Sequence, residues 1–109
     1  MATMDSLKKT LSSLRGHRKM YENRFEDDLK YSDTARTEKL KTLVLEQNDK
    51  VIAHIKKMLD AVEDDQAQAY IVAQMDDAEN IERKIKETYV TYCQRILEGL
   101  AQSNQRNRA

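Results

Sequence analysis

The fold is decided between residues 4 and 29, which read MDSLKKTLSSLRGHRKMYENRFEDDL. In this stretch apolar side chains recur at alternating intervals of three and four residues, with one basic interruption. The positions are Met4, Leu7, Leu11, Leu14, Arg18, Tyr21, Phe25 and Asp28 or Leu29. That alternation is the heptad pattern of a long helix that buries one narrow face against other helices. It predicts a helix over about residues 5–31.

A second heptad series lies between Leu40 and Val62. The residues just before it, 32–34, read SDT, and serine, aspartate and threonine oxygens are the groups that cap the first turn of a helix. The two signals together predict a helix over about residues 34–63.

A third series begins at residues 70 and 71 and ends at Leu100. Asp65, with Gln68 three residues later, has the form of a capping box, in which two side chains satisfy free backbone N–H groups at a helix start. The combination predicts a helix over about residues 66–102.

The composition disfavours the other fold classes. The 109 residues contain no proline and only two glycines, so they lack the turn residues that hairpins and β/α units need. Helices joined by short connections run antiparallel to their neighbours, so we expect one all-α domain: an antiparallel three-helix bundle with coiled-coil-like long helices and a flexible polar tail at 103–109. Two alternatives stay open, namely disorder of so polar a chain and fusion of the last two helices into one rod.

Two features of the predicted helices bear on how they pack. Gly16 lies inside the first helix, where glycine is unfavourable, so either the helix bends there or another backbone approaches closely. The helix over 66–102 is longer than the helix over 5–31. Its far end would therefore protrude, unless a second copy or another chain covers it.

The formal net charge is zero, but the charges are unevenly distributed along the chain. Residues 6–21 include five bases and no acid, whereas residues 58–82 include eight acids and no base. Two interpretations remain. Antiparallel helices bring the two blocks together, or the basic block meets an acidic partner or phosphate.

Cys93 is the only cysteine, so no disulfide framework or set of thiolate metal ligands can form. Beside Tyr92 and Ile96 it is expected to be a small buried hydrophobe rather than a reactive thiol. Residues 1–10 lack the apolar run of a signal peptide, and no stretch approaches the ~20 consecutive apolar residues of a membrane span. We therefore expect a soluble, intracellular (cytoplasmic) protein with no membrane partner.

No arrangement of residues for catalysis or metal binding stands out. His17 and His54 are the only histidines, and neither has a second ligand at the spacing of a zinc site. The acidic pairs at 64–65 and 76–77 lack the glycine and the alternating oxygen ligands of an EF-hand loop. The serines at 12–13 have no partner base. We expect a protein that is not an enzyme and that uses no metal, cofactor or small-molecule substrate.

Aromatic and aliphatic residues on the first and third predicted helices are the candidates for binding a partner, because tyrosine combines apolar area with a polar tip and aromatic residues are frequent in interfaces. The candidates are Tyr21, Phe25, Tyr70, Tyr89, Tyr92, Ile96 and Leu100. The alternative is that these side chains only complete a core that has little phenylalanine and no tryptophan.

The function expected from these features is protein binding, by self-association or to a heterologous helix. The alternative is a small inhibitor or adaptor, of the kind that phages or mobile elements encode, which binds a larger host protein. A third possibility is nucleic-acid binding, although the zero net charge and the acids at 26–28 argue against it. It would use a basic patch formed by Lys8, Lys9, Arg15, Arg18 and Lys19.

The order of short motifs resembles a known family. The basic first helix contains Leu14-Arg15-Gly16 and then Asn23-Arg24-Phe25-Glu26, and the third helix contains Glu87-Thr88-Tyr89-Val90-Thr91-Tyr92. Over residues 4–100 this is similar to the helical N-terminal Gag region of BEL/Pao-type LTR retrotransposons. The resemblance implies a scaffold segment that helps Gag molecules to associate during particle assembly. The positions that match are the Arg15-Gly16 step, Tyr89 and Tyr92.

Overall fold

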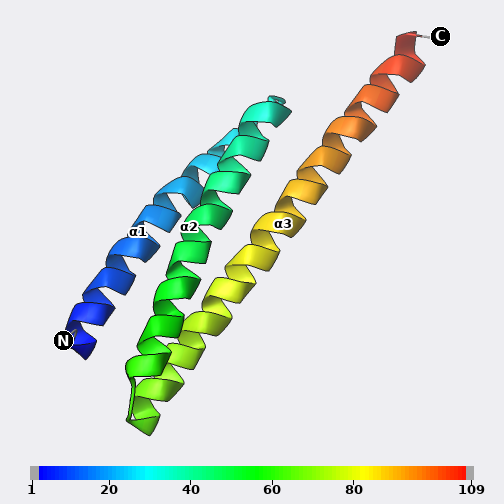
Figure 1. Ribbon diagram of the computed structural model, residues 1–109. Coiled ribbons are helices and arrows are strands. Elements are labelled where there is room, and N and C mark those ends of the chain that lie inside the picture. Colours follow the sequence, from blue (N-terminus) through cyan, green and yellow to red (C-terminus); the bar gives the residue numbers. More distant parts are fainter. Residues whose placement is uncertain (1–2, 108–109) are drawn as a thin grey trace.

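The computed structural model describes residues 3–107, with side chains described through residue 100. This part of the chain forms three helices and no strand, which confirms the all-α class (Figure 1). The helices are α1 (Met4–Asp28), α2 (Thr34–Ala61) and α3 (Asp65–Asn107).

The three helices form an up-down-up bundle in which α2 lies between α1 and α3 (Figure 1). Side-chain contacts show that α1 and α2 run antiparallel. Leu7, near the start of α1, contacts His54, near the end of α2, whereas Asp28, at the end of α1, contacts Thr37, near the start of α2. Contacts of Asn48 with Ala78 and of Thr37 with Tyr92 show the same for α2 and α3. Within the described residues, no Cα of α1 lies within 8 Å of a Cα of α3. The outer helices therefore meet only through long side chains.

Side-chain caps begin each helix. Thr3 Oγ1 accepts a hydrogen bond from the Ser6 N–H (3.1 Å), and Asp33 Oδ1 accepts one from the Arg36 N–H (3.2 Å). At the start of α3 the capping residue is Asp64 and not the predicted Asp65, because Asp64 Oδ2 accepts a hydrogen bond from the N–H of Ala67 (3.4 Å). Asp64 lies in a non-helical break at 62–64, so α2 and α3 are separate helices and not one rod.

The C-terminal ends of the helices differ from the predicted ones for local reasons. α1 ends at Asp28 instead of residue 31, because the chain turns through 29–33. α2 ends at Ala61 instead of residue 63, because Val62 adopts extended backbone angles. No proline or glycine follows Gly99, and α3 continues to Asn107. Residues 103–107 of the predicted flexible tail are therefore helical, whereas 108 and 109 lie outside the described residues.

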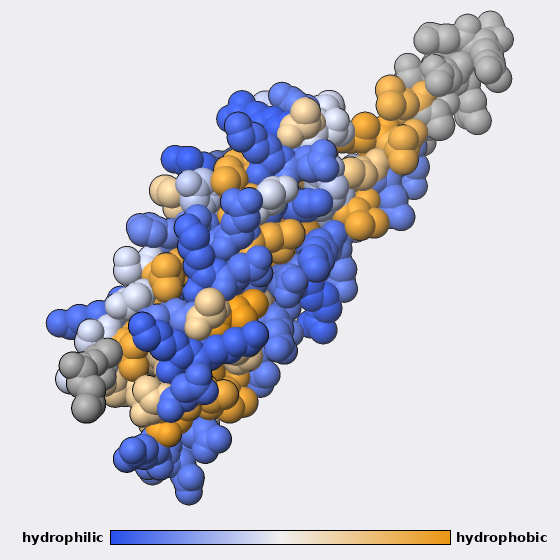
Figure 2. Space-filling view, in the orientation of Figure 1, coloured by the Kyte–Doolittle hydropathy of each residue, from blue (hydrophilic) through white to orange (hydrophobic). Residues whose placement is uncertain are grey.

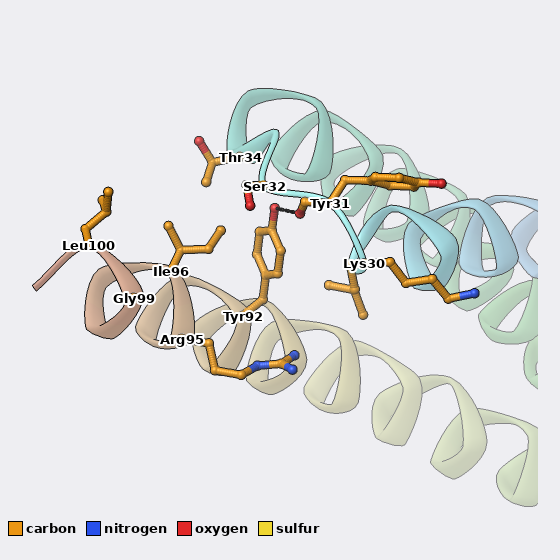
Figure 3. Close-up of a pocket in the computed structure, with 10 residues that line it drawn as sticks. Lys30, Tyr31, Ser32, Thr34, Tyr92, Arg95, Ile96, Gly99 and Leu100 are labelled. Carbon is orange, nitrogen blue, oxygen red and sulfur yellow. Dashed lines mark hydrogen bonds between the residues drawn. The ribbon is translucent and has the colours of Figure 1, made fainter. Parts of the chain in front are cut away.

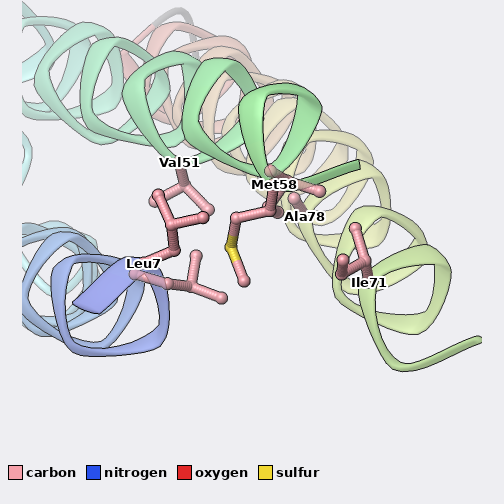
Figure 4. Packing of buried hydrophobic residues seen from close by; sticks show 7 residues of the cluster. Leu7, Val51, Met58, Ile71 and Ala78 are labelled. Carbon is pink, nitrogen blue, oxygen red and sulfur yellow. The ribbon is translucent and has the colours of Figure 1, made fainter. Parts of the chain in front are cut away.

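The core consists of two apolar clusters along the bundle. In the first, Met58 of α2 lies between Leu7 of α1 and Ile71 and Ala78 of α3 (Figure 4). The second is built on Phe25, and it joins this ring to Val44 and Ile85. On α3 the buried positions 71, 78, 85 and 92 are seven residues apart, as the heptad pattern requires.

A polar layer separates the two apolar clusters. Arg18 is only 4% exposed, and its Nη1 donates to Asn48 Oδ1 (2.9 Å). Asn48 in turn donates from Nδ2 to the carbonyl of Ala78 (3.0 Å), so the layer links all three helices. Burial lowers the pKa of Arg18, whereas the carboxylates of Glu22 and Asp77 oppose that shift. Arg18 Nε has no hydrogen-bond acceptor among the described residues.

Gly16 is not needed for close packing. No atom lies within 4 Å of the position that a Cβ would occupy there, and α1 continues through it. We therefore expect Gly16→Ala to raise the free energy of unfolding by roughly 0.5–1 kcal/mol, the helix-propensity difference between the two residues. Urea unfolding followed by circular dichroism measures this. A loss of stability would show that α1 requires a bend at this position.

Candidate protein-binding surface

The C-terminal part of α3 extends past the other two helices (Figure 1). Tyr92 is level with the α1–α2 turn, because its hydroxyl donates to the carbonyl of Tyr31 (2.7 Å). The fifteen residues from 93 to 107 continue for about 22 Å at 1.5 Å per residue. The predicted overhang of the third helix is therefore present.

Apolar side chains are exposed to solvent on this part of α3 (Figure 2). Val90 is 54% exposed, Leu97 65% and Leu100 58%, and Cys93 and Ile96 are half-buried beside them. At 100° per residue these five side chains occupy an arc of about 120° on the helix surface. We call this arc the outer seam, because it lies next to the seam of α3 that faces the core.

A groove adjoins the outer seam. It has a volume of about 540 Å³ and lies between the α1–α2 turn, at residues 29–34, and residues 92–100 of α3. Figure 3 shows Ile96 and Leu100 on the side of α3 that faces this turn, with Tyr92 at the base. Gly99 has no atom within 4 Å of a Cβ position, so the wall stays open there. Ile96 and Leu100 belong to both the groove and the outer seam, which makes the two one continuous surface.

A hydrogen-bond network fixes the turn that forms one wall of the groove. Thr37 Oγ1 lies 2.8 Å from Asp28 Oδ2 and 3.2 Å from the Tyr92 hydroxyl. The Thr37 proton goes to the Asp28 carboxylate, the stronger acceptor, and the Tyr92 proton goes to the Tyr31 carbonyl. Arg36 Nε, 3.2 Å from Asp28 Oδ1, balances the carboxylate charge. The turn is thereby tied to both α2 and α3.

The predicted partner-binding residues divide between surface and core. Ile96 and Leu100 lie on the surface just described. Phe25 and Tyr92, which are 0% and 2% exposed, do not face a partner as predicted, because the bundle itself covers them. The remaining three side chains are Tyr21 and Tyr89, half-buried against the second apolar cluster, and Tyr70, exposed near the start of α3.

Val90 and Leu97 were missed as candidates. The signal for them is a second heptad series on α3, in which residues 90, 93, 97 and 100 follow intervals of three, four and three. It runs beside the core-facing series at 85, 89 and 92. Two adjacent apolar series on one helix indicate two covered faces.

Tyr89 lies between the core and the outer seam. Its ring centroid is 6.3 Å from that of Tyr92, and Lys41 Nζ lies 4.3 Å from the Tyr89 centroid. A hydrogen bond with Cys93, together with burial, raises the pKa of Tyr89 to about 12. Tyr89 therefore remains neutral at physiological pH. Cys93 itself is half-buried and is not the buried core residue that the sequence predicted.

The basic block of α1 meets the acidic part of α3. Arg15 Nη1 donates to Gln74 Oε1 (2.8 Å), and Asp77 lies 3.6 Å from Arg15 and 3.8 Å from Arg18. The first of the two interpretations of the charge blocks is therefore correct for these residues. Arg18 is buried and Arg15 is half-buried, so the predicted basic patch is smaller than the sequence suggested, and only Lys8, Lys9 and Lys19 of it are exposed.

Among the described residues, no three His, Cys, Asp or Glu side chains gather in a group that would hold a metal ion. No helix in the described part of the chain is long and apolar enough to cross a membrane. Comparisons with protein-family models, with curated proteins and with solved structures found no match to this chain.

Proposed function

We propose that the protein is a non-enzymatic helical interaction module that binds another polypeptide through the outer seam and the adjoining groove. One observation supports this most directly: Val90, Leu97 and Leu100 are each more than half exposed on one side of α3. Contiguous exposed apolar surface is unfavourable in water and usually marks an interface.

The proposed mode of binding is the packing of an apolar helix face against this surface. Helix-in-groove recognition uses anchors at intervals of three and four residues, and the outer seam supplies them at 93, 97 and 100. Assembly of the kind that the Gag resemblance implies would use such a surface, and so would an adaptor that binds a host protein. The single cysteine favours an intracellular setting for either role.

The polar residues near the groove support a binding role over a catalytic one. The Thr37 hydroxyl, the Asp28 carboxylate and the Tyr92 hydroxyl all bond to one another or to the turn. Nucleic acid is the weaker candidate, because Asp77 already neutralises part of the basic block on α1.

Photo-crosslinking in an extract of the source cells tests the proposal. A photoreactive amino acid at Leu97 is expected to give discrete covalent adducts, because this side chain would lie within the interface. The matched control is the same amino acid at Val72, which is also apolar and exposed on α3 but lies outside the outer seam. Equal adduct yields at both positions, or none at either, would contradict the proposed function.

A further inference from the structure

We infer that the occupant of the outer seam is a second copy of this chain, packed antiparallel, with a twofold axis that passes between Ile96 and Leu97. This inference rests on the proposed function and specifies its partner. It follows from the spacing of the seam, from its charge and from the length of α3.

Four of the five residues of the outer seam have the same spacing in both chain directions. Cys93, Ile96, Leu97 and Leu100 are separated by three, one and three residues. An antiparallel copy centred between Ile96 and Leu97 therefore places Ile96 against Leu97 of the other copy, and Cys93 against Leu100. A twofold interface requires this self-complementarity, since each surface patch must fit its own copy.

The charge pattern also suits an identical partner. Between residues 88 and 100 the only charged side chains are Arg95 and Glu98. At 100° per residue, both point about 140° or more away from the centre of the arc. The seam thus offers no like charges to repel a second copy and no charge to attract an oppositely charged partner. The zero net charge of the chain removes long-range repulsion between copies as well.

The length of α3 matches this arrangement. With the axis between Ile96 and Leu97, residues 86–107 of each copy overlap, which is about 33 Å of paired helix. Each copy thus offers one uninterrupted helix over this whole length.

A cysteine introduced at Leu100 tests the register. In the proposed dimer the two natural Cys93 residues are about 10 Å apart along the helices, too far for a disulfide. The Leu100→Cys variant places the new thiol opposite Cys93 of the other copy. Within one chain the two thiols are again about 10 Å apart along the helix and cannot pair. Mild oxidation is therefore expected to give at least tenfold more covalent dimer with Leu100→Cys than with the natural chain.

Two controls accompany this variant. Thr91→Cys, exposed on the opposite side of α3, is expected to give no more dimer than the natural chain. Leu97→Glu in the Leu100→Cys background is expected to abolish the covalent dimer, because it buries a charge at the axis. Leu97 and Leu100 are exposed, so neither change disturbs the core.

Several results would overturn the second-copy inference. One is that sedimentation equilibrium finds only monomer at all concentrations up to millimolar. Another is that the natural Cys93 alone forms covalent dimer efficiently, which would indicate a parallel pair of helices. Equal dimer yields from Thr91→Cys and Leu100→Cys would do the same. If photo-crosslinking at Leu97 captures only a different protein, this inference fails while the proposed function stands; if it captures nothing, both fail.

Discussion

Replacement of Phe25 by alanine is expected to lower the free energy of unfolding by about 3–5 kcal/mol. The ring is fully buried, and Val44 of α2 and Ile85 of α3 surround it in the second apolar cluster. Truncation removes the transfer free energy of the ring and leaves a cavity that rigid helices fill only in part. Because small domains are stable by only about 5–15 kcal/mol, the variant would be partly unfolded at physiological temperature.

Urea unfolding, followed by circular dichroism at several temperatures, measures the effect. Met20→Ala is the matched control, since it also truncates a large apolar side chain of α1, but one that is substantially exposed. Its expected cost is below about 1 kcal/mol. A loss of less than about 1 kcal/mol for Phe25→Ala would mean that the three helices do not close around this ring.

The number, type and order of the helices could be predicted because each has a heptad series of its own. Such a series depends only on local spacing, and so does the cap at Asp33. The helix ends were less predictable. Asp64 and Asp65 are both good capping residues, and only the backbone at 62–64 decides between them.

The candidate site was predicted in part. The overhang followed from unequal helix lengths, and it led to Ile96 and Leu100. For Phe25 and Tyr92 the sequence left burial in the core and contact with a partner as alternatives, because a heptad position faces the core or a partner according to which neighbouring helix reaches it. Leu97 is harder to identify from the sequence, because its apolar series runs directly beside the core series of α3.

The polar layer at Arg18 shows a different limit of the sequence. The sequence shows that Arg18 interrupts the heptad series, but Asn48, its hydrogen-bond partner, is thirty residues away and belongs to no motif. A basic residue among other basic residues also suggests an exposed patch. Only the packing of three helices shows that this guanidinium is inside the bundle.

The Arg18→Met variant is expected to lower the free energy of unfolding by about 3 kcal/mol or more. It removes the donor to Asn48 Oδ1 and leaves the largely buried Glu22 without its cation. Asn48→Leu is expected to be similarly harmful, because it leaves Arg18 Nη1 without its acceptor in a buried position. Removal of one member of a buried polar pair costs more than the pair contributes, since the remaining group has lost water and found no substitute.

The double variant Arg18→Met with Asn48→Leu is expected to lose clearly less than the sum of the two single losses, because it joins the two apolar clusters and leaves no unpaired guanidinium or amide, although Glu22 still lacks its cation. Chemical unfolding of all four proteins gives the coupling energy. If the two single losses simply add, the layer stabilises the bundle through separate interactions. Strong non-additivity instead assigns the layer to helix register: Arg18, Asn48 and the Ala78 carbonyl meet only when α1, α2 and α3 are aligned as observed, whereas an all-apolar seam would tolerate a shift by one heptad.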